Sequence, residues 1–389
     1  MNPVSRPIGV YFGLLQLFFT LTWTVYVIFL PQLAAAAGIP KSWILWILIA
    51  DQLIFVVTDW LVGARTDAIS RVLGRIGQQV ALVTLVSALA FLLLPFIAPH
   101  AGPWPFLALT FVWTVTSSAL RAPPLMLIGK YAAAGERPAI AGWWLFGFGI
   151  AGALAPYLTG LLRNADARLP FALASISVAI AAWALIWAER HLASTAPAQI
   201  APPARRIPIA GFLVVVALTG LGFQIHFSLN SAPQYLRHAA PAELGSLMPL
   251  FWVGFNLAML PLTLLIRRHG DFAVLAAGAA IGAVAVLFAT QAGSLTMLVA
   301  AQLAAGAAWA AVMFGAFGAA LALGHTGREG YASGGMFSMF AFAAMLRILM
   351  VVTQLSQDAG VQQALTYAPA ALWTVAALLL VMLLRQRAA

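Results

Sequence analysis

The stretch that decides the fold is GARTDAISRVLGR, residues 63–75, which lies between two long apolar segments. Few other segments of the chain are as dense in polar residues. Its glycines and charged residues are Gly63, Arg65, Asp67, Arg71, Gly74 and Arg75. A short, mostly basic connection between two apolar runs is typical of a loop that joins two membrane-spanning helices.

The composition extends this interpretation to the whole chain. Of 389 residues, 63% are hydrophobic and 8% are charged, whereas soluble domains carry about 25% charged residues. Apolar stretches of about 20 residues are long enough to cross the hydrocarbon core of a bilayer. The chain has no cysteine, which excludes disulfides and thiolate metal sites.

We expect an all-α membrane protein with twelve transmembrane helices. The predicted spans cover 8–30, 42–65, 76–98, 104–128, 139–162, 169–189, 208–230, 245–266, 272–291, 294–322, 332–356 and 365–384. The connection RHLASTAPAQIAPPARRI, residues 190–207, is the longest polar one and reads as an exposed linker. It predicts an N-terminal six-helix bundle (1–190), a cytoplasmic linker (191–207) and a C-terminal six-helix bundle (208–389).

The basic residues indicate the orientation. With both termini in the cytoplasm, 14 Lys and Arg residues fall on the cytoplasmic side and 4 on the outer side, the asymmetry that the positive-inside rule expects. This placement explains the net charge of +10 without nucleic acid. The first apolar run is longer than the core of a secretory signal, so we expect it to remain as the first helix of a protein of the bacterial inner membrane.

Residues 63–75, the twelve spans and the division into halves resemble the major facilitator superfamily along essentially the whole chain. The resemblance implies two pseudo-symmetric bundles that rock about a central site. It also implies that Gly63, Asp67, Gly74 and Arg75 belong to a gating network on the cytoplasmic side. The second half has a weakly similar basic segment, RRHGD at 267–271, which also follows the second span of its half.

Two finer resemblances point to different branches. The seven-residue step from Asp67 to Gly74 is similar to the glycoside–cation symporters, in which an aspartate at the position of Asp59 belongs to the coupling-cation site. Phe55 departs from that pattern, because the branch has a second aspartate there. The glycines and Pro156 of the fifth span loosely resemble a motif of drug:proton antiporters, although close packing of small residues explains them equally well.

Ionisable groups within spans are costly and are therefore functional candidates. Five occur here: Asp51, Asp59, Arg121, His226 and Arg347. Asp51, on one helix face with Thr58, is the first candidate for proton coupling; the alternative is a static pair with Arg121. For Asp59 the alternatives are a charge network at the helix end and cation binding.

Arg347 is the expected anchor for an anionic substrate, because its guanidinium fork suits carboxylate or phosphate. Arg121 is the second deep cation. His226 is either an interfacial histidine whose hydrogen bonds are satisfied within the protein, or a residue that relays a proton or donates a hydrogen bond to the substrate. Further predicted cavity residues are Tyr26, Trp113, Trp143, Trp144, Asn256 and Trp309.

The sequence therefore predicts a monomeric secondary active transporter that couples a small, amphipathic, anionic solute to a proton gradient. Proton-coupled drug efflux and sodium-linked sugar uptake remain as alternatives, as does a membrane scaffold or lipid scramblase. No enzyme motif, metal-ligand spacing or cofactor motif is apparent.

Overall fold

The computed structural model describes residues 5–73, 76–133, 135–195, 208–324 and 327–385. These residues are almost entirely helical. The α-helices are α1 (Ser5–Ala36), α2 (Ile44–Leu73), α3 (Gly77–Ala101), α4 (Pro103–Ser117), α5 (Ala122–Tyr131), α6 (Arg137–Leu162), α7 (Arg168–Thr195), α8 (Ile209–Ile225), α9 (Ser231–Tyr235), α10 (Leu244–Leu247), α11 (Pro249–His269), α12 (Asp271–Gln291), α13 (Leu295–Leu323), α14 (Glu329–Val352) and α15 (Ala359–Arg385). Short 3-10 segments are η1 (Lys41–Trp43), η2 (Ser118–Leu120), η4 (Pro241–Glu243) and η5 (Leu355–Gln357), and η3 (His226–Asn230) is a π-helical turn.

Eleven helical segments of the described chain are long and apolar enough to cross a membrane. Helices dominate because each one satisfies its own backbone hydrogen bonds, which lipid cannot do. Large apolar side chains also point outward: Leu257 is 71% exposed and Leu260 is 80% exposed. Such an apolar exterior suits a protein whose surroundings are hydrocarbon rather than water.

The expected fourth span, 104–128, is not one helix. It consists of α4, η2 and α5, with the break at Arg121. Pro123 and Pro124 follow at once, and a proline ring clashes with the carbonyl group one turn earlier and donates no backbone hydrogen bond. The break divides the segment into two pieces that are each too short to count as a spanning helix, so the prediction of a continuous fourth span is wrong.

Two other boundaries need correction. The predicted loop 63–75 is helical as far as Leu73, because α2 continues beyond the expected end of the second span. The linker expected at 191–207 begins later, since α7 runs to Thr195; its residues 196–207 lie outside the described part of the chain. The tenth predicted span, 294–322, is the single helix α13.

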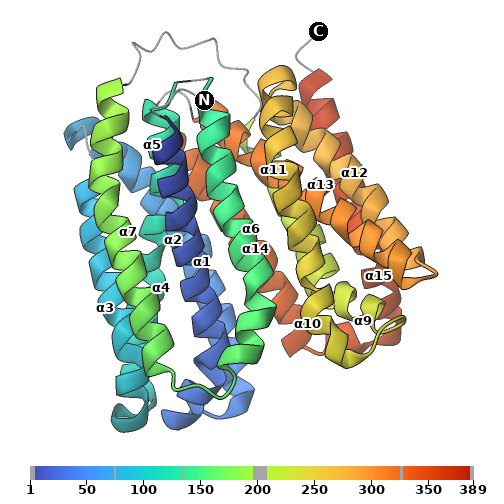
Figure 1. Ribbon diagram of the computed structural model, residues 1–389, viewed down its shortest axis with the longest axis horizontal. Coiled ribbons are helices and arrows are strands. Elements are labelled where there is room, and N and C mark those ends of the chain that lie inside the picture. The colour runs from blue at the N-terminus through green and yellow to red at the C-terminus, as the bar shows by residue number, and fades with distance from the viewer. Residues whose placement is uncertain (1–4, 74–75, 134, 196–207, 325–326, 386–389) are drawn as a thin grey trace.

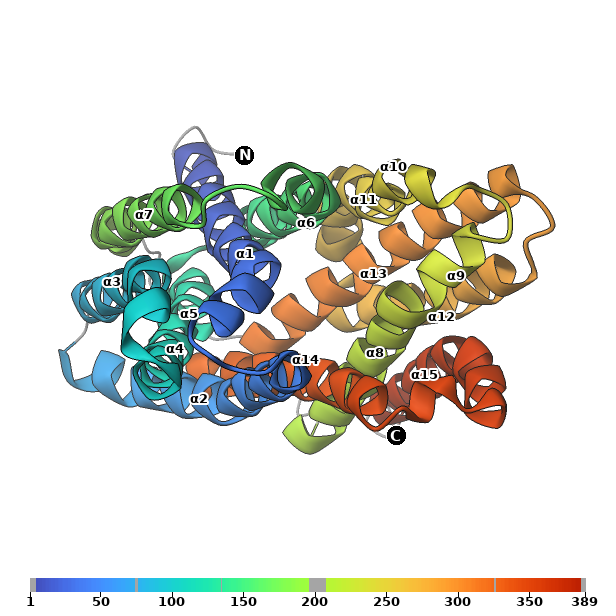
Figure 2. The same ribbon diagram turned by 90° about the horizontal axis from the view of Figure 1, so that it is seen from below.

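The helices of residues 5–195 gather on one side of the molecule and those of residues 209–385 on the other (Figure 1). The pairs α2–α14 and α6–α11 join the two groups. We call the end at which α1 begins and α15 ends the terminal end, at the top of Figure 1, and the opposite end, which carries α9 and α10, the distal end. Figure 2 shows the helices end-on from the distal end.

Candidate functional site: a central cavity between the two helix groups

A cavity of about 400 Å³ lies between the two helix groups. Helices α1, α2 and α6 of the first group and α8, α13 and α14 of the second supply its wall. The wall is mainly aromatic, with contributions from Trp23, Phe55, Phe223, Trp309, Phe337 and Phe340. Phe223 and Trp309 stack with their ring centroids 4.3 Å apart. The aromatic faces therefore favour a flat or apolar portion of a ligand.

Arg347 lies in this wall on α14. Its Nε is buried and has no hydrogen-bond partner, and no ion pair forms on it among the described residues. An arginine retains its positive charge in proteins, and a buried charge is costly unless it is paired. The site thus presents an uncompensated cation to the cavity.

Arg121, the second cation of the wall, has a partner. Its Nη1 lies 3.1 Å from Oδ2 of Asp59, whose side chain is fully buried. The guanidinium also lies over the rings of Phe55 at 4.6 Å and Phe337 at 5.5 Å. Because Phe337 belongs to α14, Arg121 contacts both helix groups at the same time. The hypothesis that Arg121 pairs with Asp51 is wrong, because the ion pair forms with Asp59.

Asp51 forms a separate polar cluster. The hydroxyl groups of Tyr26 and Thr114 donate hydrogen bonds to its carboxylate at 2.8 and 2.9 Å. Asp51 is 2% exposed, and no ion pair forms on it among the described side chains. Thr58, expected to act with Asp51, is hydrogen-bonded instead to Ser118 in η2, with 2.7 Å between the two hydroxyl oxygens. The structure therefore places Asp51 with Tyr26 and Thr114, and Thr58 with the segment beside Arg121.

Asp67 connects the two helix groups near the terminal end. Its carboxylate accepts hydrogen bonds from the backbone N–H groups of Gly330 and Tyr331, both at 2.8 Å. These N–H groups belong to the first turn of α14, which is left without intrahelical acceptors and carries the positive end of the helix dipole. The contact therefore ties α2 to α14 by a charge-assisted interaction.

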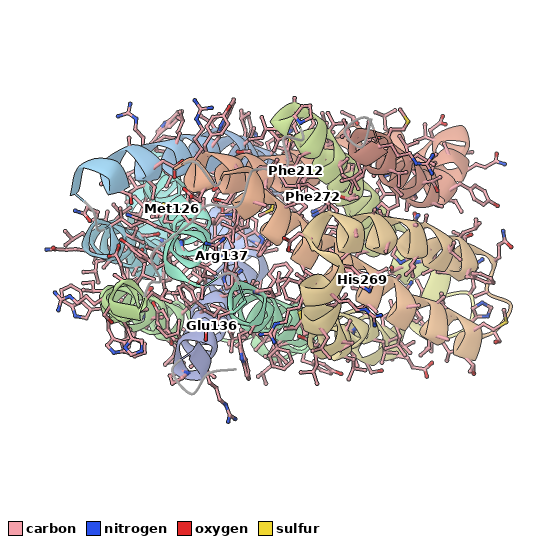
Figure 3. All side chains as sticks on the ribbon, turned by 90° about the horizontal axis from the view of Figure 1, so that it is seen from above. Met126, Glu136, Arg137, Phe212, His269 and Phe272 are labelled. Atoms are coloured by element: carbon pink, nitrogen blue, oxygen red, sulfur yellow. The ribbon has the colours of Figure 1, made fainter. Side chains whose placement is uncertain are left out.

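The neighbouring glycine allows the helices to approach closely. A Cβ atom at Gly63 would overlap the carbonyl oxygen of Gly330. Of the other predicted gating residues, Arg65 is exposed on α2, whereas the side chain of Arg71 and residues Gly74 and Arg75 lie outside the described part of the chain. Figure 3, which looks onto the terminal end, shows Met126 and Arg137 on the side of the first group and Phe212 and Phe272 on the side of the second.

Several residues predicted to bind substrate lie away from the cavity wall. Tyr26 and Trp113 are buried together near Asp51, with their ring centroids 4.5 Å apart. Trp143 packs against Gly9 and Gly13 of α1. Their direct contact with a substrate stays a prediction. Trp144 and Trp309, by contrast, do line the cavity.

In the second half, His226 is buried and Asn256 is half-buried. The side-chain nitrogen of Asn256 donates to the carbonyl of Trp252 at 2.8 Å, and its oxygen has no partner. His226 lies 3.0 Å from Gln302. Neither residue belongs to the cavity wall, so the structure groups them with helix packing rather than with Arg347.

Sequence reasoning did not select several polar wall residues, namely Gln16, Thr20, Gln52 and Gln224. Gln16 accepts a hydrogen bond from the indole of Trp144 at 2.6 Å and donates one to Thr20 at 3.0 Å. The available signal was the four-residue spacing of Gln16 and Thr20, which places both on one helix face. It was read only as an interruption of an apolar run.

Comparisons with known proteins agree on the fold. No family model and no curated protein sequence matches the chain. Among solved structures, the human organic anion transporter MFSD10 (TETRAN) is similar with a TM-score of 0.76 and 17% identity, over 98% of this chain and 100% of that one. A bacterial homologue of the iron transporter ferroportin, in an outward-facing state, gives a TM-score of 0.75 and 14% identity, over 97% and 99%.

A third similar structure is the Escherichia coli fucose:proton symporter FucP, with a TM-score of 0.67 and 16% identity, over 97% of this chain and 98% of that one. The three proteins are named for different substrates, so the shared property is the architecture. The finer resemblance to the glycoside–cation branch stays a prediction. The helix order, the central cavity and these likenesses together show that the chain has the fold of the major facilitator superfamily transporters.

Proposed function

We propose that the protein is a secondary active transporter that moves a small, amphipathic organic anion by alternating access, coupled to a proton gradient. The observation that carries the proposal is Arg347, which presents an unpaired positive charge to an aromatic cavity. A carboxylate or phosphate on the substrate completes the bidentate hydrogen bonding that a guanidinium favours. The aromatic wall accepts the apolar part of the same molecule.

The charge balance of the wall favours a single negative charge on the substrate. Asp59 already neutralises Arg121, so Arg347 is the cation of the described cavity wall that is left without an acidic partner. With one monoanion bound, the net charge of the cavity is close to zero, whereas a lipophilic cation is repelled by the positive charge of Arg347. The cavity therefore supports anion transport over the alternative of cationic drug efflux, although its aromatic wall suits both classes.

Asp51 is the proposed proton carrier. As a carboxylate, it accepts from Tyr26 and Thr114. As a carboxylic acid, it donates to Thr114, whose own hydroxyl then donates to the carbonyl of Thr110, 2.9 Å away. Both protonation states keep a complete set of hydrogen bonds, which is what a group that loads and releases a proton needs.

The conformational part of the proposal rests on the α2–α14 contact. Asp67 and Gly63 hold the groups together near the terminal end, and the cavity lies towards the distal end from that contact. We propose that this is the distal-open state and that breaking the Asp67 contact allows the opposite state. In this proposal both termini are cytoplasmic. The segments α4, η2 and α5 together form one discontinuous span. The protein is a monomer in which residues 1–190 and 208–389 move as two bundles.

The test is binding of a matched ligand series to the purified protein. 2-Naphthoate, its neutral amide and a naphthyl trimethylammonium ion share one ring system but differ in charge. We expect naphthoate to raise the melting temperature and Arg347→Gln to weaken its binding at least tenfold. Arg163→Gln, which removes an exposed arginine at the end of α6, is the control for net charge. Equal binding of the neutral amide, or unchanged naphthoate binding in Arg347→Gln, would contradict the anchoring role.

A further inference from the structure

A second pocket of about 420 Å³ lies at the distal end within the second helix group. It shares no lining residue with the central cavity. Asn230, Gln234 and Arg237 line one side, and Gln362 and Thr366 of α15 line the other. None of its lining residues is acidic, and Arg237 is the cation among them.

A chain of hydrogen bonds fixes how Gln234 faces this pocket. The Ser231 hydroxyl donates to the carbonyl of His226 at 2.9 Å, so its oxygen is left to accept. The Gln302 amide nitrogen donates to Ser231 at 3.2 Å and to the side-chain oxygen of Gln234 at 3.1 Å. The Gln302 oxygen is thereby turned towards Nε2 of His226, 3.0 Å away. Because the oxygen of Gln234 is occupied, its amide nitrogen is left as the free end.

The side-chain nitrogen of Gln234 is a donor for which the described part of the protein provides no acceptor. Gln234 is 6% exposed, and its Nε2 is buried with no hydrogen-bond partner. A buried donor without a partner costs free energy comparable to a lost hydrogen bond. Because Nε2 is buried, a ligand with acceptor oxygens in the pocket would remove that cost after a small shift of the Gln234 side chain exposes the nitrogen to it.

Arg237 adds a positive charge that the protein only partly offsets. Its Nη1 and Nη2 donate to the carbonyls of Thr290 and Ala289, at 3.1 and 3.3 Å, at the end of α12. A helix C-terminus supplies about half a negative charge, whereas the guanidinium carries a full positive one and has five N–H donors. Asp358 is an acidic residue four positions before Gln362. Its carboxylate already accepts a hydrogen bond from the backbone N–H of Val361 at 3.0 Å, and it does not line the pocket.

We propose that this distal pocket binds an oxyanion, a phosphate-type group, separately from the central cavity. The donor-rich, acid-free lining and the oriented Gln234 amide are complementary to acceptor oxygens with negative charge. The group belongs either to a soluble phosphate or to the headgroup of an anionic phospholipid. His226 and Gln302 are positioning residues in this site, because they orient Gln234 without lining the pocket.

The experiment places a negative charge in the pocket without disturbing the fold. Gln362 is exposed and lines the pocket, whereas its neighbour Gln363 is exposed and does not. Gln362→Glu is therefore compared with Gln363→Glu, and Arg237→Gln with Arg163→Gln. Binding of inorganic phosphate is measured by calorimetry, and binding of short-chain phosphatidylglycerol and phosphatidylcholine by native mass spectrometry.

We expect Gln362→Glu and Arg237→Gln to weaken binding about tenfold, while both controls stay within twofold. Binding of inorganic phosphate alone identifies a soluble ligand, and binding of phosphatidylglycerol but not phosphatidylcholine identifies a lipid headgroup. The proposal is overturned if neither probe binds, or if Gln362→Glu and Gln363→Glu behave alike. Naphthoate binding at Arg347 is an independent readout, so failure here does not count against the proposed transport function.

Discussion

Asp59 on α2 and Arg121 at the break between α4 and α5 form an ion pair, with 3.1 Å between Oδ2 and Nη1. Neither carboxylate oxygen of Asp59 has a further hydrogen-bond partner, so Arg121 is the group that compensates its charge. The pair also fixes a cation at the cavity wall without leaving it available to a substrate. In the proposed function, Arg121 is therefore a structural cation and Arg347 is the cation that binds the substrate.

The first prediction is that Asp59 and Arg121 are coupled in stability. Removing one partner of a buried pair leaves an uncompensated charge and costs about 3 kcal/mol. Arg121→Gln should therefore lower the melting temperature strongly, because it strands the fully buried Asp59. The double variant Asp59→Asn with Arg121→Gln should be more stable than Arg121→Gln alone. Thermal melts of the four proteins complete a double-mutant cycle, and additive effects would argue against a functional pair.

The sequence predicted the fold class well because spanning helices have a strong signal of length and hydropathy. The break at Arg121 was not predicted, although Pro123 and Pro124 mark it. The continuation of α2 to Leu73 was missed because polar residues were taken as a loop, whereas Ala64, Arg65 and Arg71 are compatible with a helix.

The site was predicted only in part, because pairing depends on helix rotation. The sequence indicated only Asp51 as the partner of Arg121. Asp51 and Asp59 are eight residues apart, which corresponds to about 12 Å of rise and about 80° of rotation along an α-helix. The packing of α2 against α4 and η2 sets both the axial position and the rotation, and it brings Asp59 to Arg121. Arg347 does lie in the cavity wall, as expected for an intramembrane charge, which is costly anywhere except beside a cavity or a partner; its role as a substrate anchor stays a prediction.

The second prediction concerns proton coupling. Asp51→Asn mimics the protonated acid, because its amide oxygen can accept from Tyr26 while its amide nitrogen donates to Thr114, but it cannot carry a proton. In proteoliposomes we expect uptake driven by a pH gradient to fall at least tenfold, while counterflow exchange of labelled substrate continues. Asp166→Asn, in the exposed turn between α6 and α7, is the matched control. Undiminished gradient-driven uptake by Asp51→Asn would show that the proton is carried elsewhere.

The third prediction tests the Asp67 contact. Asp67→Ala removes the acceptor of two N–H groups of α14, so the terminal end should open more often. The chain contains no cysteine, which makes it a natural background for thiol labelling. Ala332→Cys places a reporter at a residue that is 0% exposed. We expect Asp67→Ala to accelerate maleimide labelling of this cysteine roughly 5- to 30-fold, as a population shift of one or two kcal/mol predicts. Unchanged labelling would show that the contact does not hold this end closed.

The last prediction uses two glycines that differ only in their surroundings. A Cβ at Gly63 would overlap the carbonyl oxygen of Gly330, whereas a Cβ at Gly160 meets nothing within 4 Å. Alanine favours a helix over glycine by about 1 kcal/mol, so Gly160→Ala should leave the protein equally or more stable. Gly63→Ala should lower the melting temperature and speed the labelling of Ala332→Cys, because α2 and α14 must separate to admit the methyl group. Since both substitutions add the same atom to a helical residue, a difference between them reports the closeness of α2 and α14 rather than helix propensity. Equal behaviour of the two variants would mean that close approach at Gly63 contributes nothing to closing the terminal end.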